Sequence, residues 1–215
     1  MLTQLLQKVN SRLPFVKYLL PVSVKRWIIW NFMGGKADYE SKSRLPSRRY
    51  LEMEILPWLR ASRCSVLFVG AGPYTYPYHR AFETARLRFA TIDINPGARV
   101  WGAREHYVAS ILEVDQLLPS VKFDAVLCNG VFGFGVNRDQ DKNRALQLFS
   151  ELLNPRGILL LGWNNDLIGD PLNLDEMRRL FEPAVGTPFL RRMVFETHVY
   201  DLFTKKPAGF LAGSD

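Results

Sequence analysis

Apolar residues recur with two different spacings along the chain, and the spacing changes near residue 64. In front of that point they return at helical intervals, as Leu51, Ile55 and Leu59 do. Behind it, short continuous apolar runs alternate with amphipathic segments. The pattern predicts three parts: a helical extension or cap over residues 1–63, an α/β domain over 64–207 and a tail over 208–215.

The extension is expected to contain two or three helices. We predict a mobile loop near residues 34–47, where the sequence becomes polar and carries Gly34 and Gly35. Pro57 lies inside the last helical pattern. Because proline has no N–H to donate, we expect it to end or bend that helix.

The sequence from residue 64 onward predicts an alternation of strands and helices. The run CSVLFVG at 64–70 lacks polar alternation, as is typical of a parallel strand covered on both faces. Residues 189–206 read as two strands without room for a crossover helix, so we expect an antiparallel pair there. The fold class is therefore α/β: a Rossmann-like doubly wound sheet, mostly parallel, with a C-terminal antiparallel hairpin. Further strands are predicted at 88–94, 105–110, 123–130 and 157–163, and helices at 77–87, 112–118, 139–153 and 173–181.

Ligands of such sheets bind beyond the carboxyl ends of the strands, where the strand order reverses. Gly70 and Gly72 permit a sharp turn and the close approach of a ligand, although a plain turn would also use them. Asp93 follows the next strand, where a carboxylate accepts hydrogen bonds from a ribose diol or, alternatively, caps the turn at Asn95. The residues expected along this rim are Gly70 to Tyr74, Asp93, Asn129 and Asn164.

Net charge of +7 is concentrated in the extension, which holds twelve Lys or Arg and four Asp or Glu. Such a segment could bind an anionic membrane surface, a nucleic acid or an acidic substrate. Equally, its charges could simply form the solvent-exposed face of its helices. The domain behind it is close to neutral, and the extension's aromatic residues cluster with aliphatic ones in RWIIWNF. We therefore expect no specific nucleic-acid binding.

Cys64 and Cys128 are the only cysteines. In neighbouring parallel strands they would lie at opposite ends, roughly 13 Å apart, which is too far for a disulfide. This favours a reducing, cytoplasmic location. Polar residues within 1–10 stand where a signal peptide needs an apolar core, so no signal peptide is predicted. Pro and Lys or Arg residues interrupt the apolar stretch over 13–32, so no membrane span is predicted either.

The order of these motifs resembles the class I S-adenosylmethionine-dependent methyltransferases, over about residues 64–205. The resemblance implies S-adenosylmethionine as the cofactor. A nicotinamide dinucleotide fits less well, because Thr75 stands where its motif favours a third Gly or Ala. The matching segments are VGAGPY, TIDI, VASIL, FDAVLCNGVF, the helix before LNPRGILLLGW, and HVYDLFTKKP.

The resemblance also implies roles for individual residues. The glycine turn would pass under the methionine part of the cofactor, and Asp93 would hold the ribose hydroxyls. Ser110 would lie at the adenine amine, and Phe68 and Tyr74 depart from the family's acidic residue and third glycine. Ile94 and Ile111 would contact the adenine, and Asn129 and Gly130 would lie beside the methionine amine and the sulfonium. The implied cofactor-binding positions are Gly70, Ala71, Gly72, Tyr74, Asp93, Ile94, Ser110, Ile111, Asn129 and Gly130.

Methyl transfer depends mainly on alignment, with a general base where the acceptor must lose a proton. The candidates for that role are His79, Asn164 and Asp166, with Asn165 beside them. His79 either faces the ligand or lies on the surface of the first helix of the domain. The WNND segment at 163–166 either binds the acceptor or a divalent ion, or only forms a turn. No resident metal is predicted, and His198 is expected to be structural.

Two functions are compatible with these observations. The first is a methyltransferase acting on a small-molecule acceptor, such as a natural product, a sugar or a lipid-linked compound, with the extension covering the acceptor. The alternative is a non-catalytic binding or regulatory module with the same fold, which Phe68 and Tyr74 favour. The strand end CNGVF lacks the Asn/Asp-Pro-Pro-Tyr/Phe of relatives that methylate base nitrogens, which argues against that activity.

Overall fold

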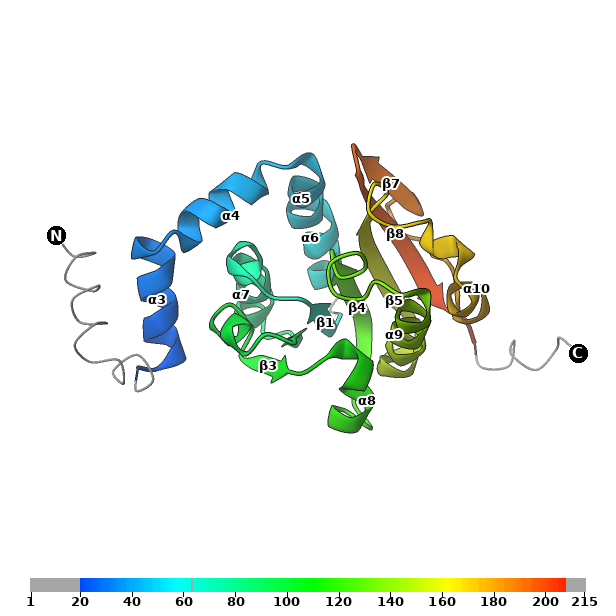
Figure 1. Cartoon of the computed structure of the whole chain (residues 1–215), viewed down its shortest axis with the longest axis horizontal. Helices are drawn as coiled ribbons and strands as arrows, with labels where there is room; N and C mark the ends of the chain where they lie inside the picture. The colour runs from blue at the N-terminus through cyan, green and yellow to red at the C-terminus, as the bar shows by residue number, and fades with distance from the viewer. Residues whose placement is uncertain (1–19, 63, 208–215) are drawn as a thin grey trace, which may run out of the picture.

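The computed structural model describes residues 20–62 and 64–207, and its centre is one mixed sheet (Figure 1). The strand order is β3-β2-β1-β4-β5-β8-β6, and β7 pairs with β8 outside this path. The strands are β1 Val66–Val69, β2 Phe89–Asp93, β3 Glu105–Val108, β4 Phe123–Asn129, β5 Leu153–Asn164, β6 Phe181–Pro183, β7 Arg192–Phe195 and β8 His198–Lys205.

Neighbouring strands from β3 to β5 run parallel, and β8 runs antiparallel to β5, β6 and β7. This arrangement confirms the predicted doubly wound, mostly parallel sheet and its C-terminal antiparallel pair. The order reverses between β1 and β4, which places a crevice at their carboxyl ends. Strand β6 begins at Phe181, the last residue of the helix predicted at 173–181.

Each face of the sheet has its own apolar core, because successive side chains of a strand point to opposite faces. Leu67 and Val69 of β1 pack toward α9 (Asp139–Leu152), α8 (Val114–Leu117) and α10 (Asp175–Leu180). Val66 and Phe68 pack on the other face with α7 (Tyr76–Thr84). The prediction of a strand buried on both faces is thereby confirmed.

The segment in front of β1 belongs to this second core. A π-helical turn, η1 (Leu51–Ile55), continues into α6 (Leu56–Ala61), and Leu51, Ile55 and Leu59 are almost fully buried beside β1. Pro57 coincides with the change from π to α geometry. The wide turn in front of it accommodates a residue that has no N–H to donate.

The predicted loop near 34–47 is wrong. Helices α3 (Val22–Phe32), α4 (Gly35–Ser43) and α5 (Pro46–Tyr50) follow one another as an arch around α7 (Figure 1). Gly34 adopts φ +87° and turns the chain, and a Cβ on Gly35 would lie 2.9 Å from the Trp101 ring. The two glycines thus form a tight corner between packed helices.

The remaining short helices connect strands. Within the described residues, 3-10 turns are found at η2 (Pro73–Thr75), η3 (Pro96–Val100), η4 (Ile111–Glu113) and η5 (Pro171–Asn173). Both cysteines are free thiols, as predicted.

Candidate active site

Four parallel strands end at one rim of the sheet, and each ends on or beside a residue singled out from the sequence. Gly70 follows β1, and Asp93, Asn129 and Asn164 are the last residues of β2, β4 and β5. The parallel registers of these strands bring the four positions to the same side. The predicted rim is therefore present.

The glycine turn is fixed by hydrogen bonds from its own backbone. Gly70 has φ +90°, a left-handed conformation that glycine adopts without strain, and its N–H donates to the Ile92 carbonyl at 2.8 Å. The Gly72 N–H donates to the Thr75 hydroxyl at 3.0 Å. These hydrogen bonds fix the backbone of the glycine turn at the rim, where its small side chains leave space for a ligand.

Asp93 links the end of β2 to this turn. Its Oδ2 accepts from the Ala71 N–H at 2.8 Å, and its Oδ1 accepts from the Asn95 N–H at 2.7 Å. Each carboxylate oxygen retains further lone pairs for a ligand hydroxyl. The capping role and the ligand role considered for this residue are therefore compatible.

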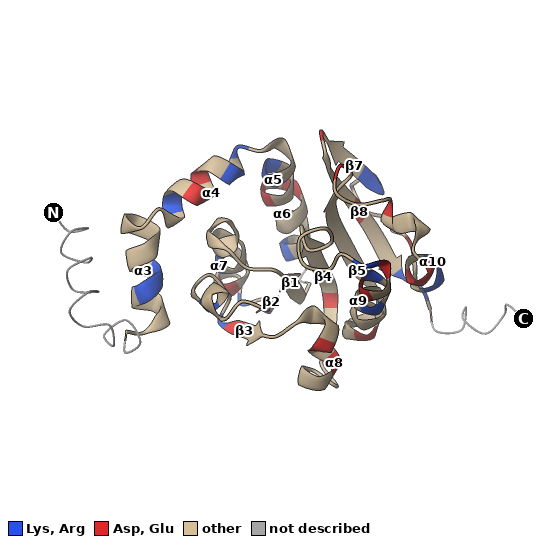
Figure 2. Cartoon of the chain, viewed as in Figure 1, with Lys and Arg blue, Asp and Glu red and all other residues tan. Residues whose placement is uncertain are grey.

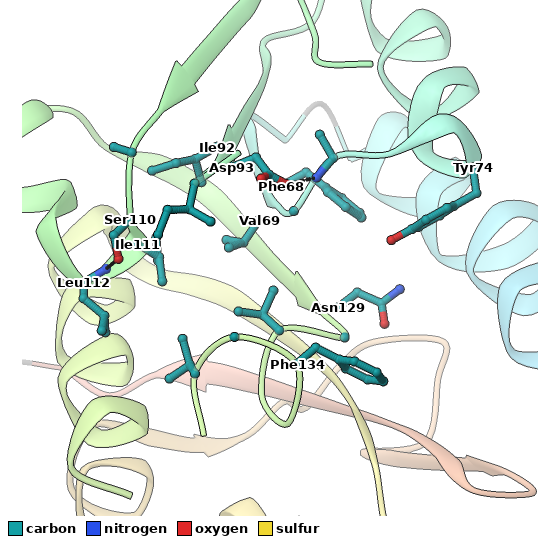
Figure 3. A pocket seen from close by; sticks show the side chains of 18 residues that line it. Phe68, Val69, Tyr74, Ile92, Asp93, Ser110, Ile111, Leu112, Asn129 and Phe134 are labelled. Atoms are coloured by element: carbon teal, nitrogen blue, oxygen red, sulfur yellow. Dashed lines mark hydrogen bonds between the residues drawn. The ribbon is translucent and has the colours of Figure 1, made fainter. Parts of the chain in front are cut away.

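These residues line a cavity of about 280 Å³, here called the first cavity (Figure 3). Tyr74, Asn129 and Phe134 form one side of it, and Ser110, Ile111 and Leu112 form the other (Figure 3). The Ser110 hydroxyl accepts from the Leu112 N–H at 3.2 Å, so it caps η4. The wall also contains Phe68, Val69, Gly70, Ala71, Ile92, Asp93, Ile94, Ala109, Gly130, Val131, Gly135 and Val136.

Asn129 has buried polar atoms that are at best weakly satisfied within the protein. Among the described residues its side-chain nitrogen and oxygen have no partner in hydrogen-bond geometry, although its amide lies close enough to the Tyr200 hydroxyl to lower the pKa of that group. A Cβ on Gly162 would lie 2.2 Å from the Asn129 Oδ1, so the glycine leaves the space that this side chain fills. Since an unpaired buried amide is costly, its position in the cavity wall indicates a polar ligand.

A second cavity of about 450 Å³ adjoins the first. The two share Tyr74, Asn129, Gly130 and Phe134 as a common wall. The second cavity is otherwise lined by residues of α4, of α5 and its N-cap, of the end of β5 and of the β7–β8 turn: Lys42, Leu45, Pro46, Ser47, Arg48, Asn164, Phe195, Glu196, Thr197 and His198. The site thus consists of two compartments separated by a few side chains.

Solved structures of known proteins share this architecture, although no protein-family model and no curated protein sequence matches the chain. The N-methyltransferase NodS of Bradyrhizobium japonicum superposes with a TM-score of 0.54 at 16% identity, over 77% of this chain and 99% of that one. A 1,6-didemethyltoxoflavin-N1-methyltransferase of Burkholderia thailandensis gives 0.52 at 18% identity, over 79% and 84% of the two chains. A TehB-like S-adenosylmethionine-dependent methyltransferase of Corynebacterium glutamicum gives 0.50 at 19%, over 80% and 100%.

The chain has the class I methyltransferase fold.

Two positions depart from the pattern of class I methyltransferases. Phe68 is buried and packs edge-on against Tyr78 and in a stacked arrangement on Phe89. Tyr74 lies in the wall between the two cavities, where Lys42 and Arg48 each approach its ring at 4.3 Å. Both aromatic side chains lie in the wall of the first cavity and do not fill it.

The three predicted catalytic candidates are in different places in this methyltransferase fold. Asn164 lines the second cavity. His79 lines neither cavity: it is 2% exposed on α7, and its Nδ1 lies 3.1 Å from the Glu83 Oε1. The expected surface position of His79 is therefore wrong, and its catalytic role stays a prediction. Asp166 is exposed in a turn, in which the Leu167 N–H donates to the Asn164 carbonyl.

His198 is a candidate that the sequence did not reveal. Its Nδ1 lies 2.8 Å from the Asn164 Oδ1, and its Nε2 has no partner among the described residues. With the Asn164 oxygen as acceptor, Nδ1 carries the proton and Nε2 keeps a lone pair. The pair arises because Asn164 and His198 are opposite each other in the antiparallel β5–β8 register.

Burial and the positive charge of Arg48 lower the pKa of His198 to about 4, so the imidazole is neutral at pH 7. An unfolded histidine protonates near pH 6.5, so the unfolded state binds more protons between pH 6.5 and 4. We expect this residue to destabilise the fold by about 2 kcal/mol between pH 7 and pH 5. Urea denaturation at pH 7 and at pH 5 should show that His198→Gln loses less unfolding free energy between the two pH values than the parent protein does. An equal loss in both proteins would contradict the lowered pKa of His198.

The described residues contain no group of three His, Cys, Asp or Glu side chains arranged to hold a metal ion. Over the same residues, no helix is both long and apolar enough to cross a bilayer. Figure 2 shows acidic residues between basic ones along α4, where Lys36 pairs with Glu40 and Lys42 with Asp38. These ion pairs interrupt the basic character of the extension.

Proposed function

We propose that the chain is an S-adenosylmethionine-dependent methyltransferase that acts on a small-molecule acceptor. The observation that supports this best is the pair of adjoining cavities, with Gly70, Asp93 and Asn129 around the first and a shared wall at Asn129 and Gly130. The similar structures include an N-methyltransferase and a methyltransferase of 1,6-didemethyltoxoflavin, a small molecule. The chain's own acceptor remains part of the proposal.

The residues of the first cavity suit this cofactor. Asp93 offers carboxylate oxygens to ribose hydroxyls, and the Gly70 turn leaves room for the methionine chain. The unsatisfied amide of Asn129 offers both a donor and an acceptor to the amino-acid end. Ile94 and Ile111 provide apolar contact for the adenine, and Ser110 lies at its edge.

When bound, S-adenosylmethionine supplies a methyl group on a sulfonium, which is already a strong electrophile. The second cavity would hold the acceptor on the far side of Asn129 and Gly130, where Asn164 and His198 lie in its wall. Asn164 would position that imidazole through Nδ1. Neither His79 nor Asp166 lines these cavities, so neither is assigned a part in the reaction.

Isothermal titration with S-adenosylmethionine tests the proposal directly, and we expect micromolar affinity. A metabolite extract incubated with methyl-labelled cofactor should then yield a labelled product by mass spectrometry. Lack of any cofactor binding by the folded protein would refute the proposal and favour the non-catalytic module. The predicted cytoplasmic location and the capping function of residues 1–63 also remain proposals.

Substitution of Gly70 by Ala should weaken cofactor binding about tenfold, because φ +90° strains any residue with a Cβ by roughly 1–2 kcal/mol and the turn must shift. Gly186→Ala is the matched control: it has φ +72°, lies between β6 and β7, and has open space around it. Both variants should lose similar unfolding free energy. Calorimetry should show the affinity loss for Gly70→Ala alone, and equal affinities would exclude a role for this turn.

We also propose that nucleic acid is not the acceptor. The second cavity is enclosed partly by α4 and α5, and α4 carries its acidic residues in ion pairs with its lysines. We expect any binding to a duplex or a single strand to disappear at physiological salt, since only counterion release would drive it. A sequence-selective complex at that salt concentration, seen by fluorescence anisotropy, would restore nucleic-acid methylation as a hypothesis.

A further inference from the structure

Two cationic side chains from the N-terminal helices lie in the wall of the second cavity. Lys42 comes from α4 and Arg48 from α5. Both contact the same aromatic ring, because the Lys42 Nζ and the Arg48 Cζ each lie 4.3 Å from the centre of the Tyr74 ring. The cavity therefore has its positive charge next to the wall that it shares with the first cavity.

Arg48 differs from the other partly buried arginines in having little to balance its charge. Arg88, Arg144 and Arg192 each pair with a carboxylate, and Arg26 donates to two backbone carbonyls. Among the described residues, Arg48 forms no such ion pair, and it makes one hydrogen bond, from Nη1 to the Tyr78 hydroxyl at 3.2 Å. A partly buried guanidinium with most of its donors unused is costly unless an anion pairs with it.

No carboxylate among the described residues pairs directly with Arg48. Glu52 is one hydrogen bond further away, since it accepts from the Tyr78 hydroxyl at 3.0 Å, and its charge balances that of Arg48 only from this distance. His198 lies in the same cavity and is neutral. Glu196 is the acidic residue of the cavity wall, but it is exposed in the turn between β7 and β8.

Lys42 can contribute a second positive charge. Its partner is Asp38, at 3.3 Å, and both side chains are substantially exposed at 42% and 37%. Such a surface ion pair is weak, so the ammonium can reorient toward a ligand at little cost. Leu45, Phe134 and Phe195 supply apolar surface in the same cavity.

We propose that the acceptor of this enzyme carries an anionic group, a carboxylate or a phosphate, that binds Arg48 and Lys42 in the second cavity. The inference rests on the proposed methyltransferase function and names the acceptor class. The guanidinium fork forms two parallel hydrogen bonds with a carboxylate or phosphate, which fixes orientation as well as position. An apolar body bearing one such group matches the mixed wall of the cavity.

The experiment compares ligands that differ in charge but hardly in shape. Benzoate, benzamide and benzamidine are titrated into the protein saturated with S-adenosylhomocysteine, and their affinities are measured by calorimetry. We expect benzoate to bind at least about tenfold more tightly than benzamide, and benzamidine to bind least. Phenyl phosphate, titrated in parallel, shows whether the site prefers a phosphate or a carboxylate.

Arg48→Gln should abolish the preference for benzoate over benzamide, and Arg48→Lys should retain part of it, since it keeps the charge without the fork. Arg49→Gln is the matched control, because Arg49 is exposed on the same helix and does not line the cavity. Circular dichroism and thermal denaturation check that each variant is folded. A preference for the anion that survives Arg48→Gln, or a site at which neither benzoate nor phenyl phosphate binds more tightly than benzamide at millimolar concentration, would overturn the inference.

The two proposals fail in different ways. S-adenosylhomocysteine binding is measured on the same samples before the ligands are added. Binding of S-adenosylhomocysteine without an anion preference would remove only the inference about the acceptor. Failure of the folded parent protein to bind S-adenosylhomocysteine would remove the methyltransferase proposal as well.

Discussion

Replacing Asp93 by Ala is expected to raise the dissociation constant of S-adenosylmethionine by at least about 100-fold. In the proposed role the carboxylate would offer the ribose hydroxyls two charged acceptors, and hydrogen bonds to charged groups contribute about 1.5–3 kcal/mol each. It also accepts from the N–H groups of Ala71 and Asn95, so its loss releases the glycine turn from the end of β2. Isothermal titration of both proteins at one salt concentration provides the measurement.

Asp93→Asn separates the two contributions. The amide keeps one acceptor oxygen and the size of the side chain, so we expect an affinity between those of the parent and the Ala variant. Thermal denaturation must show that both variants remain folded. Should the folded Ala variant bind the cofactor as tightly as the parent, Asp93 would have no part in the site.

Replacing Asp201 by Ala is expected to cost about 3 kcal/mol of unfolding free energy, the effect of removing one partner from a buried charged network. Asp201 is 2% exposed and accepts from the Trp163 Nε1 at 2.8 Å and from the Arg192 Nε at 2.6 Å. Its loss would leave a buried indole N–H without a partner. Urea denaturation at pH 7 measures the change.

Asp170 provides the comparison for this network. It also pairs with Arg192, at 2.7 Å, but its side chain is 34% exposed and does not contact Trp163. Asp170→Ala should therefore cost clearly less than Asp201→Ala, because Arg192 keeps its buried partner and water reaches the gap. Equal losses would show that the indole contact contributes nothing.

The sequence predicted those parts of the fold and of the candidate site that depend on local order. Gly70 and Asp93 follow successive strands of one βαβ unit, so a right-handed crossover brings them to the same rim whatever the rest of the chain does. The apolar run before Gly70 was enough to predict a strand covered on both faces. The antiparallel end followed from the short connection between its two strands.

The features that the sequence did not predict depend on contacts between distant residues. The position of His198 next to Asn164 requires the β5–β8 register, and a shift of one residue would turn the imidazole to the other face. Arg48 reaches the second cavity because α5 and η1 pack on the sheet. The polar composition of α4 resembles that of a loop, and its helix depends on the corner at Gly34 and Gly35 and on its packing against η2.

Strand β8 pairs with β5, β6 and β7 and supplies residues to both cores, Val199 and Phe203 to one and Tyr200 and Leu202 to the other. During synthesis, the helices and strands described before β8 leave the ribosome first, and β8 then completes both apolar cores. Until then β5 has an unpaired edge, and η1 and α6 lack part of the surface that buries them. The domain should therefore complete its folding late, in a cooperative step that follows the synthesis of β8.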